Sequence, residues 1–571
     1  MLSAREPSVL KAVEKQVQSF RASSGAWLDI QLKILAAESL LASGLRRKSK
    51  AFARAPYRGA VERFFAPSAG TDPPELTEVV LATLLEAEGI AYEATTYAAL
   101  HADAALRERL LGSCDCVFAS TTLLRDLSEL APMVALLKRP HNHVVAGGAL
   151  GGILHHTWSH VPGLEVLAVG YGELLVASLA AWMRSGYREI VPPPGGRLTR
   201  VAETSILYSG VPATKDLDFL PTPDWSLAER LHGRSFSMVH YESVRGCPYR
   251  CSFCNYPFLF DDTKFRYRSA ARIAADWKML ADRGVRFVSC LDSLFTMPKR
   301  RLVELCERLI KDGTKIRWIC YARADDLEDL ETCRLMKAAG CHQVQIGVES
   351  GNQAQLDNMN KRTTVRANQT ALRNCRAVGI TSLATVIVGF PGETRATLDD
   401  SFACLQDSPP DVYYLAPFNT RVEYVPILQP DSRARFGIVT QTDGRSSAPY
   451  WKHASMSCTE IGAHARRIHR RMADERVALE GTLFYAGLLG FDARDREALL
   501  DFQRDVWTGM PLLRLTMDRL GAWAQKKLEA DVERVLCGET PPAPTADPPR
   551  GPSIRRGSRR KELPLAGREA S

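Results

Sequence analysis

The stretch Cys247-Pro-Tyr-Arg-Cys251-Ser-Phe-Cys254 decides how this chain is interpreted. It follows an extended apolar run over 236–244 and is introduced by Arg245-Gly246. The spacing lets one tight loop place three sulfurs on one face of a cube. A [4Fe–4S] cluster held by three thiolates leaves one iron open for a small molecule. A structural zinc site would need a fourth Cys or His close by, and none is present. The remaining alternative is three core cysteines that lie close in sequence by chance.

These residues resemble the motif of the radical SAM superfamily, whose cluster binds S-adenosylmethionine (SAM) through its amino and carboxylate groups on the open iron. Phe253 matches the aromatic residue usual between the second and third cysteines. The resemblance implies that Cys247, Cys251 and Cys254 ligate a [4Fe–4S] cluster.

Composition is that of a large globular chain. Its 571 residues suffice for about three or four domains, and 45% of them are hydrophobic. The formal charge is +9, but part of the basic excess lies near the ends, so we expect solvated basic segments and no nucleic-acid surface. The 14 cysteines mostly stand singly in apolar patterns, which does not indicate a disulfide framework.

Localisation is predicted from what the sequence lacks. It has no signal-peptide core and no apolar run of the roughly eighteen residues that a membrane-spanning helix needs. An oxygen-sensitive cluster also requires a reducing compartment. We therefore expect a soluble cytoplasmic protein without a membrane partner.

The fold class is predicted to be α/β, because short apolar strands alternate with helices over most of the chain. We expect the N-terminal helices to pack against the domain that follows them. The expected organisation is an N-terminal helical region (1–60), a Rossmann-like domain (61–190), a proline-rich linker (191–235), a partial barrel (236–420), a C-terminal helical region (421–538) and a disordered basic tail (539–571).

The barrel prediction rests on six strand–helix units, with strands near 236–244, 286–291, 316–321, 342–348, 383–389 and 411–416. Six units make a partial (β/α)6 barrel, which is what radical SAM proteins build. Active sites of such barrels lie at the carboxyl ends of the strands.

The resemblance assigns SAM-binding roles to residues at those carboxyl ends. An alternative for each charged member is an ion pair at the barrel rim. Arg323 is expected to pair with the SAM carboxylate, and Asp292 with its amino group. The full set is Phe253, Asp292, Arg323, Glu349, Ser350, Gly389, Gly392 and Glu393.

The Rossmann-like region resembles the cobalamin-binding domain that precedes the radical SAM domain in one large subgroup. The similarity rests on a hydroxylated turn, a Gly-Gly turn and a Gly-x-Gly-Glu turn, each after a strand: Ser120, Thr121, Thr122, Gly147, Gly148, Gly170, Gly172 and Glu173. Glycines would let the backbone approach a bulky planar ligand. The alternative is a Rossmann-like domain that holds a nucleotide or nothing. No Asp-x-His-x-x-Gly motif is present, so cobalt would lack a His lower ligand.

The resemblance implies a cobalamin-dependent radical SAM methyltransferase. It would transfer a methyl group from SAM, via methylcobalamin, to an unactivated carbon, or phosphorus, of a small-molecule or peptide substrate. An electron donor such as flavodoxin or ferredoxin is implied, and the substrate acid or base is unassigned. One alternative is ring formation or rearrangement with the same cofactors; another is a non-catalytic cobalamin or redox sensor. A methylthiotransferase would need a further cysteine triad, and only Cys114 and Cys116 precede the motif.

Overall fold

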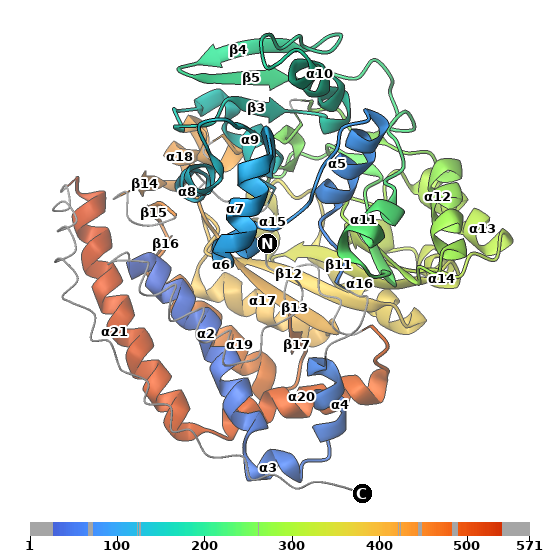
Figure 1. Ribbon diagram of the computed structural model, residues 1–571. Helices are drawn as coiled ribbons and strands as arrows, with labels where there is room; N and C mark the ends of the chain where they lie inside the picture. Colours follow the sequence, from blue (N-terminus) through green and yellow to red (C-terminus); the bar gives the residue numbers. More distant parts are fainter. Residues whose placement is uncertain are drawn as a thin grey trace, which may run out of the picture.

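The computed structural model describes residues 27–66, 72–122, 124, 127–260, 262–420, 422, 424–442, 448–481 and 489–538. The start of the predicted N-terminal region and the whole predicted tail, 539–571, lie outside these ranges. Two largely parallel sheets with helices around them dominate the molecule, the first above the second in Figure 1. No helix within the described ranges combines the length and the apolarity that crossing a bilayer demands.

The first sheet has five strands in the order β1-β2-β3-β5-β4. They are β1 (Cys116–Ser120), β2 (His143–Gly147), β3 (Val166–Val169), β4 (Arg197–Val201) and β5 (Thr204–Tyr208). All neighbours pair in parallel except β4, which returns antiparallel to β5. The accompanying helices are α5 (Leu76–Ala87), α6 (Tyr97–Ala102), α7 (Ala104–Ser113), α8 (Leu127–Leu137), α9 (Ala149–Leu154), η1 (His155–Thr157) and α10 (Gly172–Arg184). The central strands are apolar because helices cover both faces.

The segment 191–235, which we predicted to be a linker, contributes the β4–β5 hairpin to this sheet. The prediction was wrong because the proline–glycine run ends at Gly196, and the two short segments that follow it pair with each other as an antiparallel hairpin. β4 is exposed and β5 is largely buried, so the hairpin closes one edge of the sheet. Along the chain, residues 209–224 lead from this hairpin to α11 (Trp225–His232), which precedes the second sheet.

The second sheet has seven parallel strands in the order β17-β13-β12-β11-β10-β9-β6. They are β6 (Met238–Tyr241), β9 (Phe287–Cys290), β10 (Arg317–Ala322), β11 (Cys341–Glu349), β12 (Thr381–Val388), β13 (Val412–Pro417) and β17 (Leu479–Glu480). The helices between them are α12 (Ala270–Asp282), α13 (Lys299–Lys311), η3 (Asp325–Leu327), α14 (Leu330–Ala338), α15 (Gln353–Asn358), α16 (Val365–Val378) and α17 (Arg395–Asp407). The predicted α/β class with a partial parallel barrel is confirmed.

The seventh strand is a difference from the prediction. β17 comes from the region after residue 420 and pairs with β13 at the edge of the barrel sheet. It has two residues, too few for any alternation of polarity to show in the sequence. The barrel is therefore completed by a part of the chain that we predicted to be separate and helical.

The outer face of the barrel sheet is sealed by the amphipathic faces of its helices. In α13, Leu302, Leu305 and Leu309 recur at helical spacing and are buried against the sheet. Trp277 of α12 and Trp318 of β10 are fully buried with ring centroids 5.9 Å apart. Such large rings bury much apolar area each, so this cluster anchors the sheet that carries the site.

The two ends of the described chain pack together. The N-terminal helices are α2 (Trp27–Arg47), α3 (Lys50–Ala53) and α4 (Arg58–Phe65). After the barrel come η4 (Pro426–Leu428), α18 (Pro430–Phe436), a small antiparallel sheet of β14 (Val439–Gln441), β15 (Tyr450–His453) and β16 (Met456–Ser457), then α19 (Ile461–Asp474), α20 (Ala493–Thr508) and α21 (Pro511–Leu536). α2 lies along α21, and α4 lies against α20 (Figure 1).

This pairing corrects the expectation that the N-terminal helices pack against the first sheet. The rings of Trp27 and Trp523 meet edge to face with centroids 4.8 Å apart. Arg46 donates to the carboxylate of Asp505 at 2.8 Å. The apolar stripe of α2 thus finds its partner near the other end of the sequence, which periodicity within α2 cannot reveal.

Candidate active site

The three motif cysteines lie on one loop beyond the carboxyl end of β6. A short ribbon of β7 (Val244–Arg245) and β8 (Arg266–Tyr267) closes the base of this loop, which we call the cysteine loop (246–265), and η2 (Tyr256–Phe258) lies within it. Gly246 starts the loop with φ +72°, and a Cβ there would lie 2.2 Å from the carbonyl oxygen of Lys264. Only glycine fits this position.

The thiols of Cys247, Cys251 and Cys254 are free and partly exposed. Each of the first two lies close enough to act electrostatically on the third. Burial raises the pKa of the Cys254 thiol to about 12 and also raises the pKa of Cys247. The three sulfurs therefore lie together, and two of them need a counter-charge before they ionise.

The arrangement fits a cubane cluster better than a single ion. Among the residues that the structure describes, no three His, Cys, Asp or Glu side chains are arranged as ligands of one metal ion. In a cubane each thiolate binds a different iron, so the sulfurs stand at separate corners. Three soft thiols on one loop, which the described residues do not complete to a zinc site, are the donor set that such a cluster takes.

A second loop, residues 358–362 after α15, holds the cysteine loop from the barrel side. The backbone N–H of Ser252 donates to the carbonyl of Met359 at 2.9 Å. The side-chain amide of Asn360 donates to the carbonyl of Arg250 at 2.7 Å. Because both bonds reach the cysteine loop between its ligands, the thiols are positioned by the barrel and not by their own loop alone.

Backbone strain gathers around these two loops. Glu349, Asn360 and Arg362 adopt left-handed conformations with φ of 60°, 49° and 53°. Each costs of order 1 kcal/mol for a residue with a side chain. Glu349 also interrupts the register between β11 and β12. Strain of this kind persists where the surrounding contacts impose it, as they do at ligand-binding edges.

Lys361 supplies a buried cation beside the thiols. Its Nζ donates to Oε1 of Glu349 at 2.9 Å and lies 6.0 Å from the ring centroid of Phe253. Burial opposes the charge on Lys361, but Glu349 and Cys251 outweigh it and raise the lysine pKa. The sequence pointed to Glu349 but not to Lys361, because nothing in the local pattern shows that residue 361 returns to the cysteines.

The predicted turn after β12 lies against the cysteine loop. Gly389 and Gly392 have φ of +88° and +92°. A carboxylate oxygen of Glu393 accepts the backbone N–H of Gly389, which closes the turn on itself. Phe390 meets Phe253 edge to face with ring centroids 6.3 Å apart. The aromatic residue of the cysteine motif and the glycine turn thus form one wall.

Glu393 and Ser350 are both inaccessible to solvent. Burial raises the pKa of Glu393 to about 8, so this carboxyl holds its proton at neutral pH. The hydroxyl of Ser350 accepts the N–H of Asn352 at 3.2 Å and lies 3.2 Å from the hydroxyl of Ser401. Both predicted SAM residues therefore shape turns at the barrel edge.

Asp292 has other partners than the one predicted. Its Oδ1 accepts the backbone N–H groups of Ser243 and Val244 at 2.6 and 2.7 Å, and its Oδ2 accepts the Ser243 hydroxyl at 2.7 Å. Burial raises its pKa to about 6. Within the protein this carboxyl braces the backbone that leads into the cysteine loop, and its contact with the SAM amino group stays a prediction.

Arg323 is likewise engaged within the protein. Its guanidinium donates to the carbonyl of Lys361 at 2.6 Å and to Asp325 at 3.1 Å, and lies 3.8 Å above the ring of Tyr249. It joins the cysteine loop to the 358–362 loop. The sequence did not show these contacts, because the carbonyls are backbone atoms, which carry no sequence pattern; the pairing of Arg323 with the SAM carboxylate stays a prediction.

The predicted residues of the first sheet come together because β1, β2 and β3 are neighbours. The N–H of Thr121 donates to the carbonyl of Gly147 at 2.7 Å, and the hydroxyls of Ser120 and Thr122 lie 3.2 Å apart. A Cβ on Gly148 would lie 2.7 Å from Oγ1 of Thr122. This glycine is thus required by the neighbouring turn, whatever ligand the edge binds.

The third turn of this edge, which follows β3, contacts the barrel domain beside the cysteine loop. Gly170 has φ +104°, and a Cβ there would lie 2.3 Å from Oγ of Ser209. A Cβ on Gly172 would meet nothing within 4 Å, so this position is open. Glu173, predicted as a cobalamin residue, has both carboxylate oxygens bound to Arg245, next to the cysteine loop.

Residues 241–405 match the sequence model of the radical SAM superfamily. This stretch, which contains the three motif cysteines and most of the barrel strands, is similar to the radical SAM domain. It is 28% identical over 284 residues to the anaerobic magnesium-protoporphyrin IX monomethyl ester cyclase of Cereibacter sphaeroides, covering 46% of this chain and 45% of that protein. It is 28% identical over 195 residues to the bacteriochlorophyllide d C-12(1)-methyltransferase of Chlorobaculum tepidum, covering 33% of this chain and 42% of that protein. The chain thus spans about half the length of the curated relatives that it matches.

The radical SAM methyltransferase TsrM from Kitasatospora setae, solved with cobalamin and a [4Fe–4S] cluster, superposes with a TM-score of 0.59. The superposition covers 77% of this chain and 97% of TsrM at 18% sequence identity. At this identity the likeness concerns the fold. It extends beyond the radical SAM domain, so the arrangement of the two sheets is shared.

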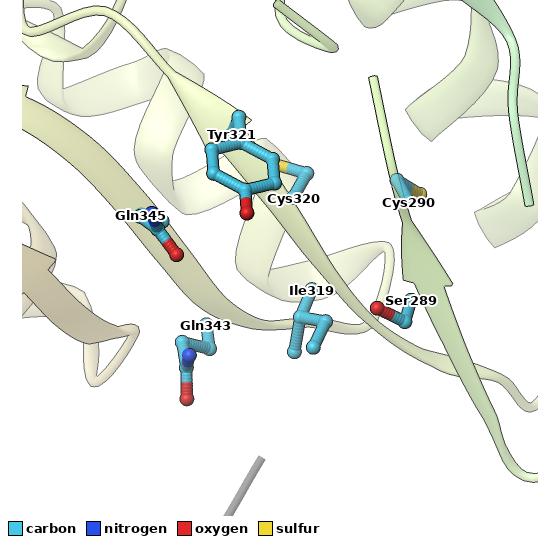
Figure 2. Close-up of a pocket in the computed structure, with 7 residues that line it drawn as sticks. All are labelled: Ser289, Cys290, Ile319, Cys320, Tyr321, Gln343 and Gln345. Carbon is cyan, nitrogen blue, oxygen red and sulfur yellow. The ribbon is translucent and has the colours of Figure 1, made fainter. Parts of the chain in front are cut away.

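The inside of the radical SAM barrel carries polar side chains that sequence reasoning missed. Ser289, Tyr321, Gln343 and Gln345 line a small internal space together with Cys290, Ile319 and Cys320 (Figure 2). Tyr321 lies beside Gln345 across the β10–β11 pairing. The only sequence trace was the alternation Gln343-Val-Gln345, in which two amides share one face of a buried strand. These are neutral polar groups on the inner face of the barrel sheet.

Proposed function

We propose that this chain is a cobalamin-dependent radical SAM methyltransferase that acts on a carbon, or phosphorus, of a small-molecule or peptide substrate. The observation that carries the proposal is the meeting of two carboxyl edges, one from each parallel sheet. A Cβ on Gly152 of α9 would lie 2.1 Å from the carbonyl of Leu259 in the cysteine loop. The edge with hydroxyl and glycine turns thus lies directly against the loop of the three thiols.

Each group of residues at this site has its own proposed role. Cys247, Cys251 and Cys254 would hold the cluster, and Lys361 would offset the negative charge of the thiolates. The turn 389–393, with Glu349 and Phe253, would bind SAM. When bound, the cluster would supply an electron, SAM would supply a carbon radical, and cobalamin would carry the methyl group. The protein orients them and excludes water through its buried, strained edge.

Cobalamin would lie at the first-sheet edge, against Ser120, Thr122 and Gly172, where the surface is exposed or open. The neutral amide and hydroxyl groups of Tyr321, Gln343 and Gln345 would orient the substrate inside the barrel. A small electron donor such as flavodoxin or ferredoxin would supply the reducing electron.

A second candidate is ring formation with the same cofactors and no methyl transfer. The specific observation in its favour is the similarity over 284 residues to a monomethyl ester cyclase. Both candidates would use the same cluster loop and the same first-sheet edge, so the two are separated by the product of the reaction.

The test is anaerobic reconstitution with iron, sulfide and cobalamin, followed by reaction with SAM carrying a deuterated methyl group. Three deuterium atoms in the product support methyl transfer. A rearranged product without label contradicts it and supports ring formation. A reduced, cluster-loaded protein that does not cleave SAM contradicts both and supports a sensor.

A further inference from the structure

Arg245 immediately precedes the cysteine loop and lies between two carboxylates from different parts of the chain. Its guanidinium donates to both oxygens of Glu173, at 2.6 and 3.0 Å, in the paired geometry that arginine and carboxylate favour. It also donates to Glu242 at 2.7 and 2.9 Å. Glu242 follows β6 in the barrel, whereas Glu173 is in the first turn of α10 in the first domain.

The rest of the Gly170-Tyr-Gly172-Glu173 turn makes the same connection. The hydroxyl of Tyr171 donates to Asp262 at 3.1 Å. The guanidinium of Arg245 lies 5.0 Å from the ring centroids of both Tyr171 and Phe260. A Cβ on Gly170 would lie 3.3 Å from the carbonyl of Phe260. This turn, which resembles a cofactor-binding element, makes much of its contact with the cysteine loop.

Burial makes the pair sensitive to the loss of either member. The side chains of Glu173 and Arg245 are each 8% exposed. Desolvation opposes the charge of Glu173, yet Arg245 and a backbone N–H hold its pKa below the ordinary value. An arginine cannot shed its charge, so without Glu173 the buried Arg245 would keep only Glu242, three residues before it in the chain, and would lose its tie to the first domain.

We propose that Glu173 is a positioning residue for the cysteine loop: the first domain supplies the carboxylate that fixes Arg245, and so fixes Cys247 relative to the first-sheet edge. The consequence for SAM binding rests on the proposed function; the consequence for the loop does not. The cluster loop of this chain is therefore completed across the domain boundary. Glu173 acts through Arg245 and not through contact with a cofactor.

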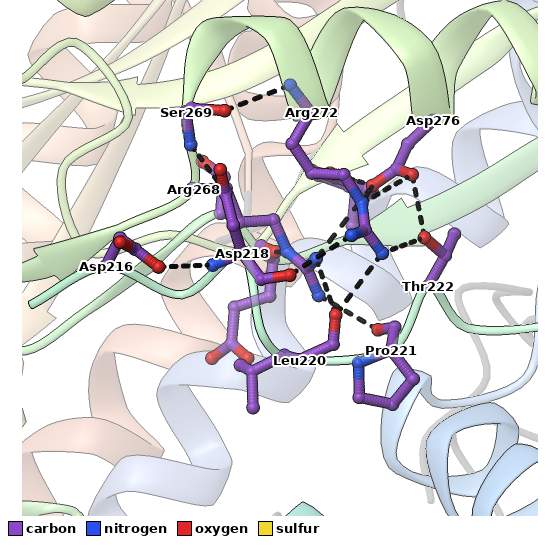
Figure 3. A network of polar contacts seen from close by, with 12 residues as sticks. Asp216, Asp218, Leu220, Pro221, Thr222, Arg268, Ser269, Arg272 and Asp276 are labelled. Carbon is purple, nitrogen blue, oxygen red and sulfur yellow. Dashed lines mark hydrogen bonds and ion pairs between the residues drawn. The ribbon is translucent and has the colours of Figure 1, made fainter. Parts of the chain in front are cut away.

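The test compares Glu173→Gln with Glu242→Gln, because each removes one carboxylate from the same arginine. Asp276→Asn is the control for losing a buried carboxylate elsewhere. Asp276 accepts the hydroxyl of Thr222 at 2.7 Å and an N–H of Arg272 at 3.1 Å, in the network that ties the connecting stretch to α12 (Figure 3). Arg245→Lys keeps the charge but loses the paired geometry. It replaces Glu173→Gln in the comparison if that variant does not fold.

The first readout is amide hydrogen exchange over residues 246–260, measured on the full chain with and without reconstituted iron and sulfide. Glu173→Gln should exchange about tenfold faster or more, and Arg245→Lys should fall between it and the unaltered protein. Glu242→Gln and Asp276→Asn should stay within about twofold of the unaltered protein in this segment. Equal acceleration by Glu242→Gln, or unchanged exchange in Glu173→Gln and Arg245→Lys, overturns the proposal.

The second readout is the electron paramagnetic resonance spectrum of the reduced cluster with and without SAM. Glu173→Gln should bind iron normally but need about tenfold more SAM to show the SAM-induced change. If the unaltered protein shows no SAM-induced change, the proposed function fails while the exchange comparison still decides the role of Glu173. If SAM perturbs the spectrum of Glu173→Gln as it does that of the unaltered protein, Glu173 does not position the cluster.

Discussion

The carboxyl edges of the first sheet and of the barrel sheet meet in this protein, and they carry different kinds of residue. The turns after β1 and β2 in the first-sheet edge are neutral, and the backbone N–H and the hydroxyl of Thr121 both donate to the carbonyl of Gly147. The barrel edge carries thiols, the buried Lys361–Glu349 pair and strained backbone. The turns after β1 and β2 form an uncharged surface, and Glu173, in the turn after β3, is paired with Arg245. The barrel edge concentrates charge at a few points beside the thiols. The first edge therefore suits a large neutral-faced ligand and the second a charged reacting centre.

The largest expected effect is at the thiols of the barrel edge. Cys254→Ala should lower SAM cleavage by about a thousandfold or more, because a cubane with two protein thiolates left is poorly held. Cys306→Ala, which removes a buried thiol of α13 outside the loop, should leave cleavage intact. Iron content and 5′-deoxyadenosine formation measure both. Normal iron content and cleavage in Cys254→Ala would contradict the assignment of the loop.

The charged character of the barrel edge is tested by Lys361→Met. Removing the lysine leaves Glu349 buried without its partner, which should cost about 3–5 kcal/mol of unfolding free energy. The double variant Glu349→Gln/Lys361→Met should recover most of that loss. Anaerobic denaturant unfolding of both variants measures the difference. A cost below about 1 kcal/mol for the single variant would mean that Glu349 reaches solvent.

The shape of the first edge is tested by Gly152→Ala. The added methyl carbon would lie 2.1 Å from the carbonyl of Leu259, so the contact between the domains must open, at about 1–3 kcal/mol. Gly172→Ala is the matched control, since nothing lies within 4 Å of its added carbon. It should be as stable as the unaltered protein.

Cobalamin titration of the Gly172→Ala variant tests the proposed cobalamin surface. If cobalamin approaches the backbone at Gly172, Gly172→Ala should weaken cobalamin binding while leaving stability unchanged. Unchanged affinity would remove Gly172 from the proposed cobalamin surface.

The smallest expected effect concerns Glu393 and depends on pH. Burial raises its folded-state pKa to about 8, above the ordinary 4.5, so the folded protein binds the extra proton between these values. Its contribution to stability is therefore full at low pH and declines as the pH rises towards 8. Relative to Glu393→Gln, which stays neutral, the unaltered protein should lose about 1 kcal/mol per pH unit between pH 6 and 8. Parallel unfolding curves for the two proteins across that range would contradict a raised pKa.

The sequence predicted the fold class and the gathering of the three cysteines because both rest on local patterns. It did not show contacts that depend on distant partners. Asp292 and Arg323 sit at the predicted strand ends, yet bind backbone groups near the cysteine loop. Lys361 reaches the thiols only because α15 and its loop fold back over the sheet. The hairpin of β4 and β5 was hidden by the proline run before it.

The pairing of the chain ends has a consequence for synthesis. Gln31 of α2 donates its side-chain amide to the carbonyl of Thr459, 428 residues further along the chain. An emerging nascent chain presents α2 long before α19 and α21 leave the ribosome. The apolar stripe of α2 cannot pack against α21 until the last helices have been made. The closing of this N-terminal helix onto the finished body is therefore a late step of folding, however early the helix itself is made.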